Sequence, residues 1–261
     1  MGKRKNLEVE QAIIEYLSTN QKILMKDAIK MFQLSESTLR RIFIKLEEEK
    51  KAVRTIGGII SAAPDSYYNY NLTSQKQKEE KDIIGKYAAR LIHSSDFIYI
   101  DCGSTTAYLS HAIVQSIQTG KLSEKLNVIT NSLINLEILH PHCNVILTGG
   151  ILNEKRKSFT GALGTDFLSN FYFSKGFFGA DGMSFDHGFS CDNILVSQLT
   201  RAALLQTNEP YVLLDSSKIN HPSYVNYASL DEVSAVITDR SISKADADAF
   251  AHCKPLLHIA D

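Results

Sequence analysis

The sequence predicts a small helical domain followed by a larger α/β domain whose sheet is mostly parallel. Three observations support this: apolar residues recur at helical spacing in the first sixty residues, strand-like runs alternate with helical stretches from residue 76 onward, and the chain has 261 residues. Alternation of strands and helices is typical of parallel sheets covered by helices. Because a single domain usually holds about 100 to 200 residues, we expect one large domain and one small one.

The composition is that of an ordinary globular protein. Hydrophobic residues make up 44% and charged residues 22% of the chain, and no apolar run approaches the roughly 18 residues that a membrane helix needs. The first residues, MGKRKNLEVEQ, lack the apolar stretch of a secretory signal, so we expect a cytoplasmic protein with no membrane partner. The cysteines lie far apart and form no CxxC pair, which favours free thiols over a disulfide framework or a zinc site: Cys102, Cys143, Cys191 and Cys253.

The net charge of −1 conceals an asymmetry between the two predicted domains. Residues 1–60 carry 12 Lys and Arg against 8 Asp and Glu, which leaves 16 against 21 for the rest of the chain. The small domain is therefore the basic one. A nucleic-acid-binding module often has this charge, although an ordinary solvated surface also carries it.

The first sixty residues predict a winged helix-turn-helix domain. Helices are expected over about residues 7–18 and 26–32, and a third begins at the N-cap residue Ser35 in SESTLRRIFIKLEEE. The third helix offers hydroxyls at its start and arginines on its outer face, which is the arrangement that enters the major groove of DNA. The side chains expected to contact DNA from this helix are Ser35, Ser37, Thr38, Arg40, Arg41 and Lys45.

A β-hairpin is expected after the third helix. The sequence AVRTIGGII, residues 52–60, alternates around Gly57-Gly58, a dipeptide that permits a hairpin turn. We interpret this hairpin as the wing, from which Arg54 would contact sugar and phosphate. The alternative is a helical subdomain with a solvated basic face, and these residues alone leave that alternative open.

Residues 61–75 are rich in Ser, Asn, Pro and Ala without a sustained period, which predicts a linker. A helix is expected next, over residues 76–93. Strands are then predicted at residues 97–100, 128–130, 145–147, 176–180, 211–215 and 233–238, and helices at residues 106–117, 133–139, 194–205 and 243–251.

The predicted strands end in polar and glycine residues. These ends are residues 101–106, 130–132, 148–150, 179–182 and 215–218. Ligands of parallel α/β sheets bind beyond the carboxyl ends of the strands, so we expect these loops to line one crevice.

The stretch FIYIDCGSTT, residues 97–106, is central to this prediction. It reads as a buried strand, a turn at Gly103 and the start of a helix, an arrangement that directs backbone N–H groups, hydroxyls and a helix dipole at one point. An anion, most plausibly a phosphate, suits such a point. Taken alone the motif is weak, because many turns carry Gly, Ser and Thr as cap residues.

The chain resembles the DeoR family of bacterial transcriptional regulators over nearly its whole length. The motifs that carry the resemblance are LSESTLRRI, LEEEKKAVRTIGGI, EEK at 79–81, DCGSTT at 101–106, VITNS at 128–132, LTGG at 147–150, FFGADG at 177–182, LLDSSK at 213–218 and ITD at 237–239. The resemblance implies a larger domain with a Rossmann-like fold of the ribose-5-phosphate isomerase and CoA transferase type. It also implies a repressor of a carbohydrate-metabolism operon that binds double-stranded operator DNA and responds to a phosphorylated sugar.

The resemblance also implies residue roles. Gly103, Ser104, Thr105 and Thr106 would hold the phosphate, Lys218 would supply positive charge, and Asp101, Asp181 and Asn131 would bind sugar hydroxyls, with the loop at Gly149 and Gly150 beside them. A homodimer or homotetramer is expected, because two-fold symmetry matches paired DNA half-sites.

One alternative function is a sugar-phosphate isomerase in which Asp181 acts as a base, with Asp186 and Lys218 as partners. The basic N-terminal domain argues against it, because an isomerase does not need such a domain. We expect no cofactor and no metal, since the HPHC sequence at 140–143 favours an exposed turn over a metal site.

Overall fold

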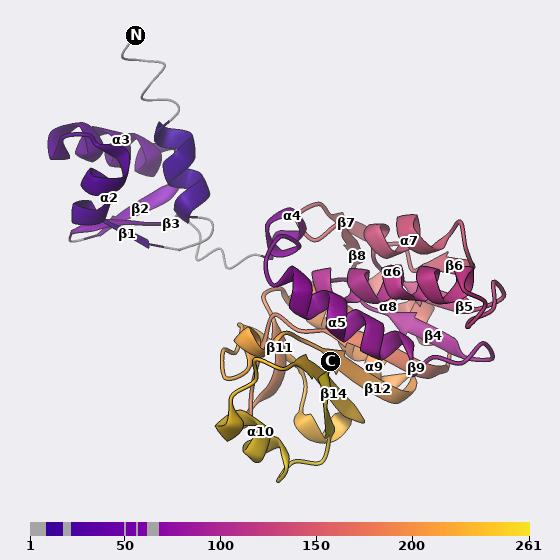
Figure 1. Cartoon of the computed structure of the whole chain (residues 1–261). Coiled ribbons are helices and arrows are strands. Elements are labelled where there is room, and N and C mark those ends of the chain that lie inside the picture. Colours follow the sequence, from indigo (N-terminus) through magenta and orange to yellow (C-terminus); the bar gives the residue numbers. More distant parts are fainter. Residues whose placement is uncertain (1–8, 18–21, 50, 56, 62–67) are drawn as a thin grey trace. The chain divides into compact units, whose positions relative to one another are not determined.

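The computed structural model describes residues 9–17, 22–49, 51–55, 57–61 and 68–261. Contacts within the chain divide it into two compact units, Met1–Tyr67 and Tyr68–Asp261, which are drawn in Figure 1. Within the described ranges, every helix is too short or too polar to cross a membrane. Each unit has its own apolar core, and the two are described separately.

The smaller unit contains a helix over residues 9–17, strand β1 (Lys22–Leu24), helices α2 (Met25–Phe32) and α3 (Glu36–Glu48), and strands β2 (Ala52–Thr55) and β3 (Gly58–Ser61). The three strands form an antiparallel sheet in the order β1-β3-β2. A winged helix-turn-helix architecture is thus present, with α2 and α3 at the predicted positions and β2–β3 as the wing. Strand β1 was not predicted; it is a three-residue strand in the stretch expected to be a connector.

Helix α3 begins where the sequence predicts because Ser35 caps it. The Ser35 hydroxyl oxygen accepts a hydrogen bond from the backbone N–H of Thr38 at 3.3 Å, which satisfies one of the free donors of the first turn. The apolar stripe of α3 lies in the core of the unit, where Leu39, Ile42, Phe43 and Leu46 are buried.

The larger unit is built on a seven-stranded sheet in the order β15-β14-β12-β9-β4-β5-β6, and every neighbouring pair of strands is parallel. The strands are β4 (Phe97–Ile100), β5 (Asn127–Thr130), β6 (Asn144–Leu147), β9 (Phe173–Gly179), β12 (Thr207–Leu213), β14 (Ala235–Asp239) and β15 (Leu256–Ala260). The predicted largely parallel sheet is confirmed, with β15 as an additional edge strand.

Helices cover both faces of this sheet (Figure 1). Alternate residues of each strand point to opposite faces: Ile98 and Ile100 of β4 pack in one core with α5 (Lys78–Ala89), α6 (Ser104–Gln118) and α7 (Leu133–Leu139), whereas Tyr99 packs in the other with α8 (Ala162–Leu168), α9 (Ile194–Leu205) and α10 (Lys244–Phe250). Burial on both faces explains the continuous apolar runs in the sequence.

Short elements project from the carboxyl edge of the sheet. Strands β7 (Ile151–Asn153) and β8 (Ser158–Thr160) form a hairpin, and β10 (Gly182–Ser184), β11 (Gly188–Cys191) and β13 (Val225–Ala228) form a small antiparallel sheet. None of these strands was predicted as an element, because three or four residues give too short a pattern to distinguish a strand from a loop.

The predicted linker, residues 61–75, is wrong in its second half. Residues 68–75 belong to the larger unit and include helix α4 (Tyr70–Thr73). Asn69 caps this helix by accepting a hydrogen bond from the N–H of Asn71, and the N–H of Tyr70 donates to the carbonyl of Lys155 at 2.8 Å. These polar residues form a cap and a docked turn, which composition alone does not distinguish from a linker.

Candidate functional site

The outer face of α3 carries the predicted DNA-binding side chains of the smaller unit. Ser37, Arg40 and Arg41 are exposed, and Arg40 lies beside Glu36 with 2.6 Å between Nη2 and Oε1. Among the described residues, Arg41 makes no ion pair, so its guanidinium is available to an external partner. Ser35 and Thr38 are occupied by the cap itself, since their hydroxyl oxygens lie 2.9 Å apart.

Two other predicted DNA contacts are engaged within the unit. The ammonium of Lys45 lies 2.5 Å from Glu10 on the first helix, and Nε of Arg54 lies 2.6 Å from Glu47 on α3. Lys45 therefore points toward the first helix, although the sequence predicted it on the outer, DNA-facing side of α3. The Arg54 pair instead ties the wing to α3.

Exposed Ile44 was missed by the sequence prediction. It lies on the same outward face of α3 as Arg41, and 39% of it is exposed. A groove beside it is lined by residues of α2, α3 and the wing, including Lys26, Arg40 and Arg54. An apolar side chain on a helix face with arginines suits contact with a thymine methyl group in the major groove.

In the larger unit, a cavity lies at the carboxyl ends of β4, β9 and β12. The predicted residues that line it are Asp101, Gly103, Ser104, Thr105, Asp181 and Lys218, and the further lining residues are Tyr68, Cys102, Arg156, Gly179, Ala180, Cys191, Val196, Thr200 and Tyr227. The loops after β4 and β12 therefore meet at one place, although Thr105 and Lys218 are 113 residues apart in the sequence. Three of the five predicted strand-end loops contribute to this cavity.

The start of α6 forms one wall of the cavity. Gly103 precedes the helix with φ 156° and ψ 162°, a backbone conformation that is almost restricted to glycine. The hydroxyls of Ser104 and Thr105 are buried, and within the described residues neither has a hydrogen-bond partner. Buried hydroxyls without partners are costly, so this wall presents two unused polar groups and the N-terminus of a fifteen-residue helix.

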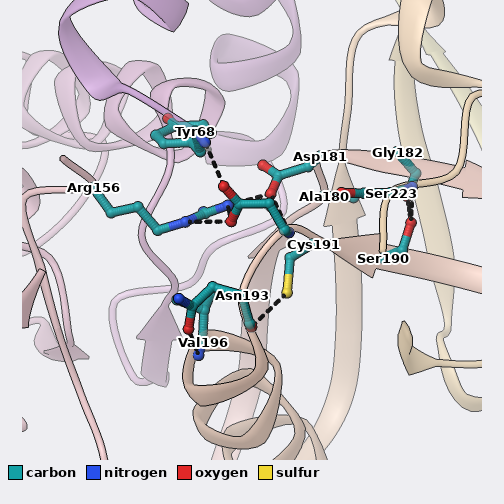
Figure 2. Close-up of polar contacts among 12 residues, drawn as sticks. Tyr68, Arg156, Ala180, Asp181, Gly182, Ser190, Cys191, Asn193, Val196 and Ser223 are labelled. Atoms are coloured by element: carbon teal, nitrogen blue, oxygen red, sulfur yellow. Dashed lines mark hydrogen bonds and ion pairs between the residues drawn. The ribbon is translucent and has the colours of Figure 1, made fainter. Parts of the chain in front are cut away.

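A buried arginine, Arg156, also lines the cavity. It comes from the turn between β7 and β8, is 4% exposed, and pairs with both Asp181 and Asp192. Figure 2 shows the guanidinium pointing toward Asp181 with Tyr68 above it, and the Cζ atom of Arg156 lies 4.3 Å from the centre of the Tyr68 ring. The sequence prediction missed Arg156, because nothing in the stretch NEKRKS distinguishes it from the three other charged residues there.

Asp101 lies at the floor of the cavity. Its carboxylate accepts hydrogen bonds from the N–H of Cys102 at 2.8 Å and from the Thr200 hydroxyl at 3.2 Å. Burial raises the pKa of Asp101 to about 6, and these hydrogen bonds and Arg156 oppose that rise. Burial likewise raises the pKa of the Cys102 thiol to about 12, so this thiol is not a reactive nucleophile.

Lys218 lines the cavity, and a second lysine, Lys81, lies near it. Lys218 donates to the carbonyl of Ala180 at 2.8 Å and lies 3.8 Å from a carboxylate oxygen of Asp215. The sequence predicted no role of its own for Lys81. Its side chain is buried and donates to the carbonyls of Thr73 and Lys76, each at 2.6 Å. Burial, with a smaller contribution from Lys218, lowers the pKa of Lys81 to about 8.

Four predicted ligand contacts lie outside the cavity lining. Thr106 donates its hydroxyl to the carbonyl of Gly103 at 3.0 Å, and Asn131 donates to the carbonyl of Phe159 at 3.4 Å. Gly149 and Gly150 have positive φ and lead into the β7–β8 hairpin, where a Cβ on Gly150 would lie 2.5 Å from the carbonyl oxygen of Thr160. Their positions assign these residues to the framework of the site.

Two family models match the chain. A DeoR-like helix-turn-helix domain matches residues 10–65, and a DeoR C terminal sensor domain matches residues 76–240. The larger unit is called the sensor unit from here on.

Similar proteins are also transcriptional regulators. The HTH-type transcriptional regulator YulB of Bacillus subtilis, itself uncharacterized, is 31% identical over 93% of this chain and 92% of its own length. The HTH-type transcriptional repressor GlcR of Bacillus subtilis is 29% identical, covering 91% and 90%, and a lactose phosphotransferase system repressor of Staphylococcus epidermidis is 30% identical, covering 82% and 84%.

Among solved structures, ribose 5-phosphate isomerase A from Methanocaldococcus jannaschii aligns with 55% of each chain at 18% identity and a TM-score of 0.42, which is too weak a similarity to support a conclusion. The isomerase alternative is set aside, because the relatives are regulators over most of their length. The chain belongs to the DeoR family, and it is a DNA-binding transcriptional regulator, not an enzyme.

Proposed function

We propose that this protein represses genes of carbohydrate metabolism and that a phosphorylated sugar, bound in the cavity of the sensor unit, modulates its affinity for operator DNA. The observation that carries the proposal is the pair of buried, unpartnered hydroxyls of Ser104 and Thr105 at the start of α6. A phosphate accepts hydrogen bonds from such hydroxyls and from the free N–H groups of a helix N-terminus.

Other groups of the cavity complement a sugar phosphate. Lys218 provides a cation that a phosphate oxygen can engage as a point charge. Asp101 and Asp181 provide carboxylates for sugar hydroxyls. The relatives support a role in carbohydrate metabolism, because one of them is named as a lactose phosphotransferase system repressor.

On the DNA side, we propose that α3 lies in the major groove with Arg41 and Ile44 facing base edges. Arg41 is exposed and has no ion-pair partner among the described residues, so it pays no cost of breaking a pair before it binds guanine. Ile44 would contact a thymine methyl group from the same face.

We further propose that the protein acts as a homodimer or homotetramer. Paired half-sites on DNA match a two-fold symmetric protein. The sensor unit exposes large apolar side chains on β7, α8 and α9, with exposed fractions of 66% for Ile151, 74% for Leu163 and 55% for Ile194. Molar mass from light scattering, measured before and after Leu163→Glu, tests this assembly; an unchanged mass that equals one chain would contradict it.

A thermal-shift screen of the full chain tests the ligand class. A sugar phosphate that binds the native state raises the melting temperature, whereas the same sugar without phosphate leaves it unchanged. Lys218→Met should weaken binding by roughly 10- to 150-fold, because a hydrogen bond to a charged group contributes about 1.5 to 3 kcal/mol. Lys244→Met is the matched control, since Lys244 is an exposed lysine of α10 and does not line the cavity.

The screen has a clear negative outcome. If hexose, pentose and triose phosphates all leave the melting temperature unchanged, the cavity is not a sugar-phosphate site. If Lys218→Met and Lys244→Met weaken binding equally, the ligand binds elsewhere on the protein.

A further inference from the structure

The ligand cavity contains the side chain of the first residue of the sensor unit, Tyr68. Its ring lies over the guanidinium of Arg156, 4.3 Å from Cζ to the ring centre, and its buried hydroxyl faces the Ser104 hydroxyl without forming a regular hydrogen bond. A buried phenol without a regular hydrogen bond is an unfavourable final state for that group. The position of Tyr68 therefore calls for an explanation beyond packing.

The backbone around Tyr68 is attached to the cavity by hydrogen bonds. The N–H of Tyr68 donates to the carboxylate of Asp192 (dashed line at Tyr68 in Figure 2), and the same carboxylate pairs with Arg156. Two residues later, the N–H of Tyr70 donates to the carbonyl of Lys155 at 2.8 Å. Tyr68 is thus held at its ring by Arg156, which lines the cavity, and at its backbone by Asp192, which pairs with Arg156.

With Tyr68 in place, little room remains. The cavity has a volume of about 10 Å³, which is at most the space of one water molecule. Sites for small organic ligands typically hold about 300 Å³ or more. A sugar phosphate can enter only if one of the lining side chains moves out.

Among the lining residues, Tyr68 and Arg156 neither lie in a helix or strand nor follow a strand of the seven-stranded sheet, and Arg156 is held by ion pairs to Asp181 and Asp192. Asp101 follows β4, and Ala180 and Asp181 follow β9, which ends at Gly179. Tyr227 lies on β13, and its hydroxyl donates to the carbonyl of Gly179 at 2.9 Å. Tyr68 precedes α4, a helix of four residues, and lies outside every helix and strand. Its withdrawal breaks one backbone hydrogen bond and one ring contact and leaves the sheet intact.

We propose that Tyr68 is an internal occupant of the ligand cavity, and that Tyr68 and the sugar phosphate exclude one another. This inference rests on the proposed function of the cavity. When ligand enters, Tyr68 leaves, and the point at which the connecting chain is attached to the sensor unit moves from Tyr68 to Tyr70. In the sequence only residues 62–67 separate Tyr68 from Ser61, the last residue of β3, so we expect the release of Tyr68 to alter the coupling between the sensor unit and the DNA-binding unit.

The coupling is reciprocal by thermodynamic necessity. Any change that removes Tyr68 from the cavity increases ligand affinity, because the fraction of molecules with an open cavity rises. The same change should make DNA affinity less responsive to ligand, since Tyr68 is already outside the cavity.

Three variants of the full chain distinguish this role from others. Tyr68→Ala empties the cavity, Tyr68→Phe keeps the ring over Arg156, and Tyr70→Ala is the matched control. Tyr70 is also a partly buried tyrosine, but it does not line the cavity.

Ligand binding is measured by thermal shift and calorimetry with hexose, pentose and triose phosphates and with inorganic phosphate as probes. We expect Tyr68→Ala to bind the best sugar phosphate about 5- to 150-fold more tightly than the wild type, the range typical of coupled sites. Tyr68→Phe should bind no more tightly than the wild type, and Tyr70→Ala should bind as the wild type does. A higher ligand affinity of Tyr68→Ala, in a variant that keeps its fold, supports the proposal.

The opposite results overturn it. Weaker binding by Tyr68→Ala would make Tyr68 a ligand contact, and equal binding by the wild type and Tyr68→Ala would show that the ring does not compete; in both cases the proposed function stands. If no probe binds either protein, both the internal occupant and the proposed function fail.

Fluorescence gives a second readout, because the chain contains no tryptophan. Tyr68→Trp places the chain's one tryptophan in the cavity, where it can be excited separately from the tyrosines. Saturating ligand should shift its emission to longer wavelength and increase its quenching by acrylamide, as the ring moves into water. Reduced quenching in the presence of ligand would overturn the proposal.

Discussion

Replacing Arg156 with methionine should destabilise the sensor unit strongly and in a pH-dependent way. Arg156 is 4% exposed and neutralises two carboxylates, Asp181 and Asp192. Methionine keeps much of the volume but leaves these carboxylates without their cation. Breaking a buried ion pair by removing one partner costs about 3 to 5 kcal/mol, so we expect a loss of that size in the free energy of unfolding at pH 7.

The pH dependence follows from Asp192. Burial raises the pKa of Asp192, and Arg156 opposes that rise; without Arg156 the pKa rises further. A carboxyl whose pKa is higher in the folded than in the unfolded state stabilises the fold when protonated, and this stabilisation is lost as pH increases through the folded-state pKa. The Arg156→Met variant should therefore be closer in stability to the wild type at pH 5 than at pH 7.

Urea unfolding followed by circular dichroism at pH 5, 6, 7 and 8 measures both effects. Arg201→Met is the matched control: Arg201 pairs with Glu232 at 2.6 Å, but its side chain is 37% exposed. Exposed pairs contribute at most about 1 kcal/mol, so this control should lose little stability. A loss below about 1 kcal/mol for Arg156→Met, or a loss that does not depend on pH, would refute the reasoning.

Three further predictions concern other parts of the chain. Arg41→Ala should weaken specific DNA binding by about 1 to 3 kcal/mol without changing the melting temperature; unchanged affinity in a gel-shift titration would remove Arg41 from the base contacts. Gly58→Ala should abolish DNA binding, because its Cβ would lie 2.2 Å from the backbone oxygen of Ile23 on β1; a variant that binds DNA normally would contradict this. Asp101→Asn should flatten the pH dependence of stability between about pH 4 and 6. Burial raises the Asp101 pKa from 3.8 to about 6, so the stability of the wild type falls by about 3 kcal/mol as pH increases across that window. An equal slope of stability against pH in both proteins would argue against this assignment.

The local pattern of the sequence determined the main elements. Continuous apolar runs predicted the central strands, as at β4, because a strand buried on both faces has no polar side. The start of α3 was predicted from Ser35, since an N-cap acts within three residues of its position. The sequence did not predict the three-residue strands or the docked turn at residues 68–75. Segments this short show no periodic pattern, and their structure depends on partners far along the chain.

Some residues of the candidate site were likewise predictable from the sequence, and others were not. The sequence alone determined that glycine and hydroxyl residues follow β4 and that Lys218 follows β12, and the parallel order of the strands made their meeting predictable. Only the tertiary structure decided that Arg156 and Tyr68 fill the cavity. A buried charge or ring is selected by neighbours that folding brings together, here Asp181 and Asp192, and no local pattern in the chain records which residues those neighbours are.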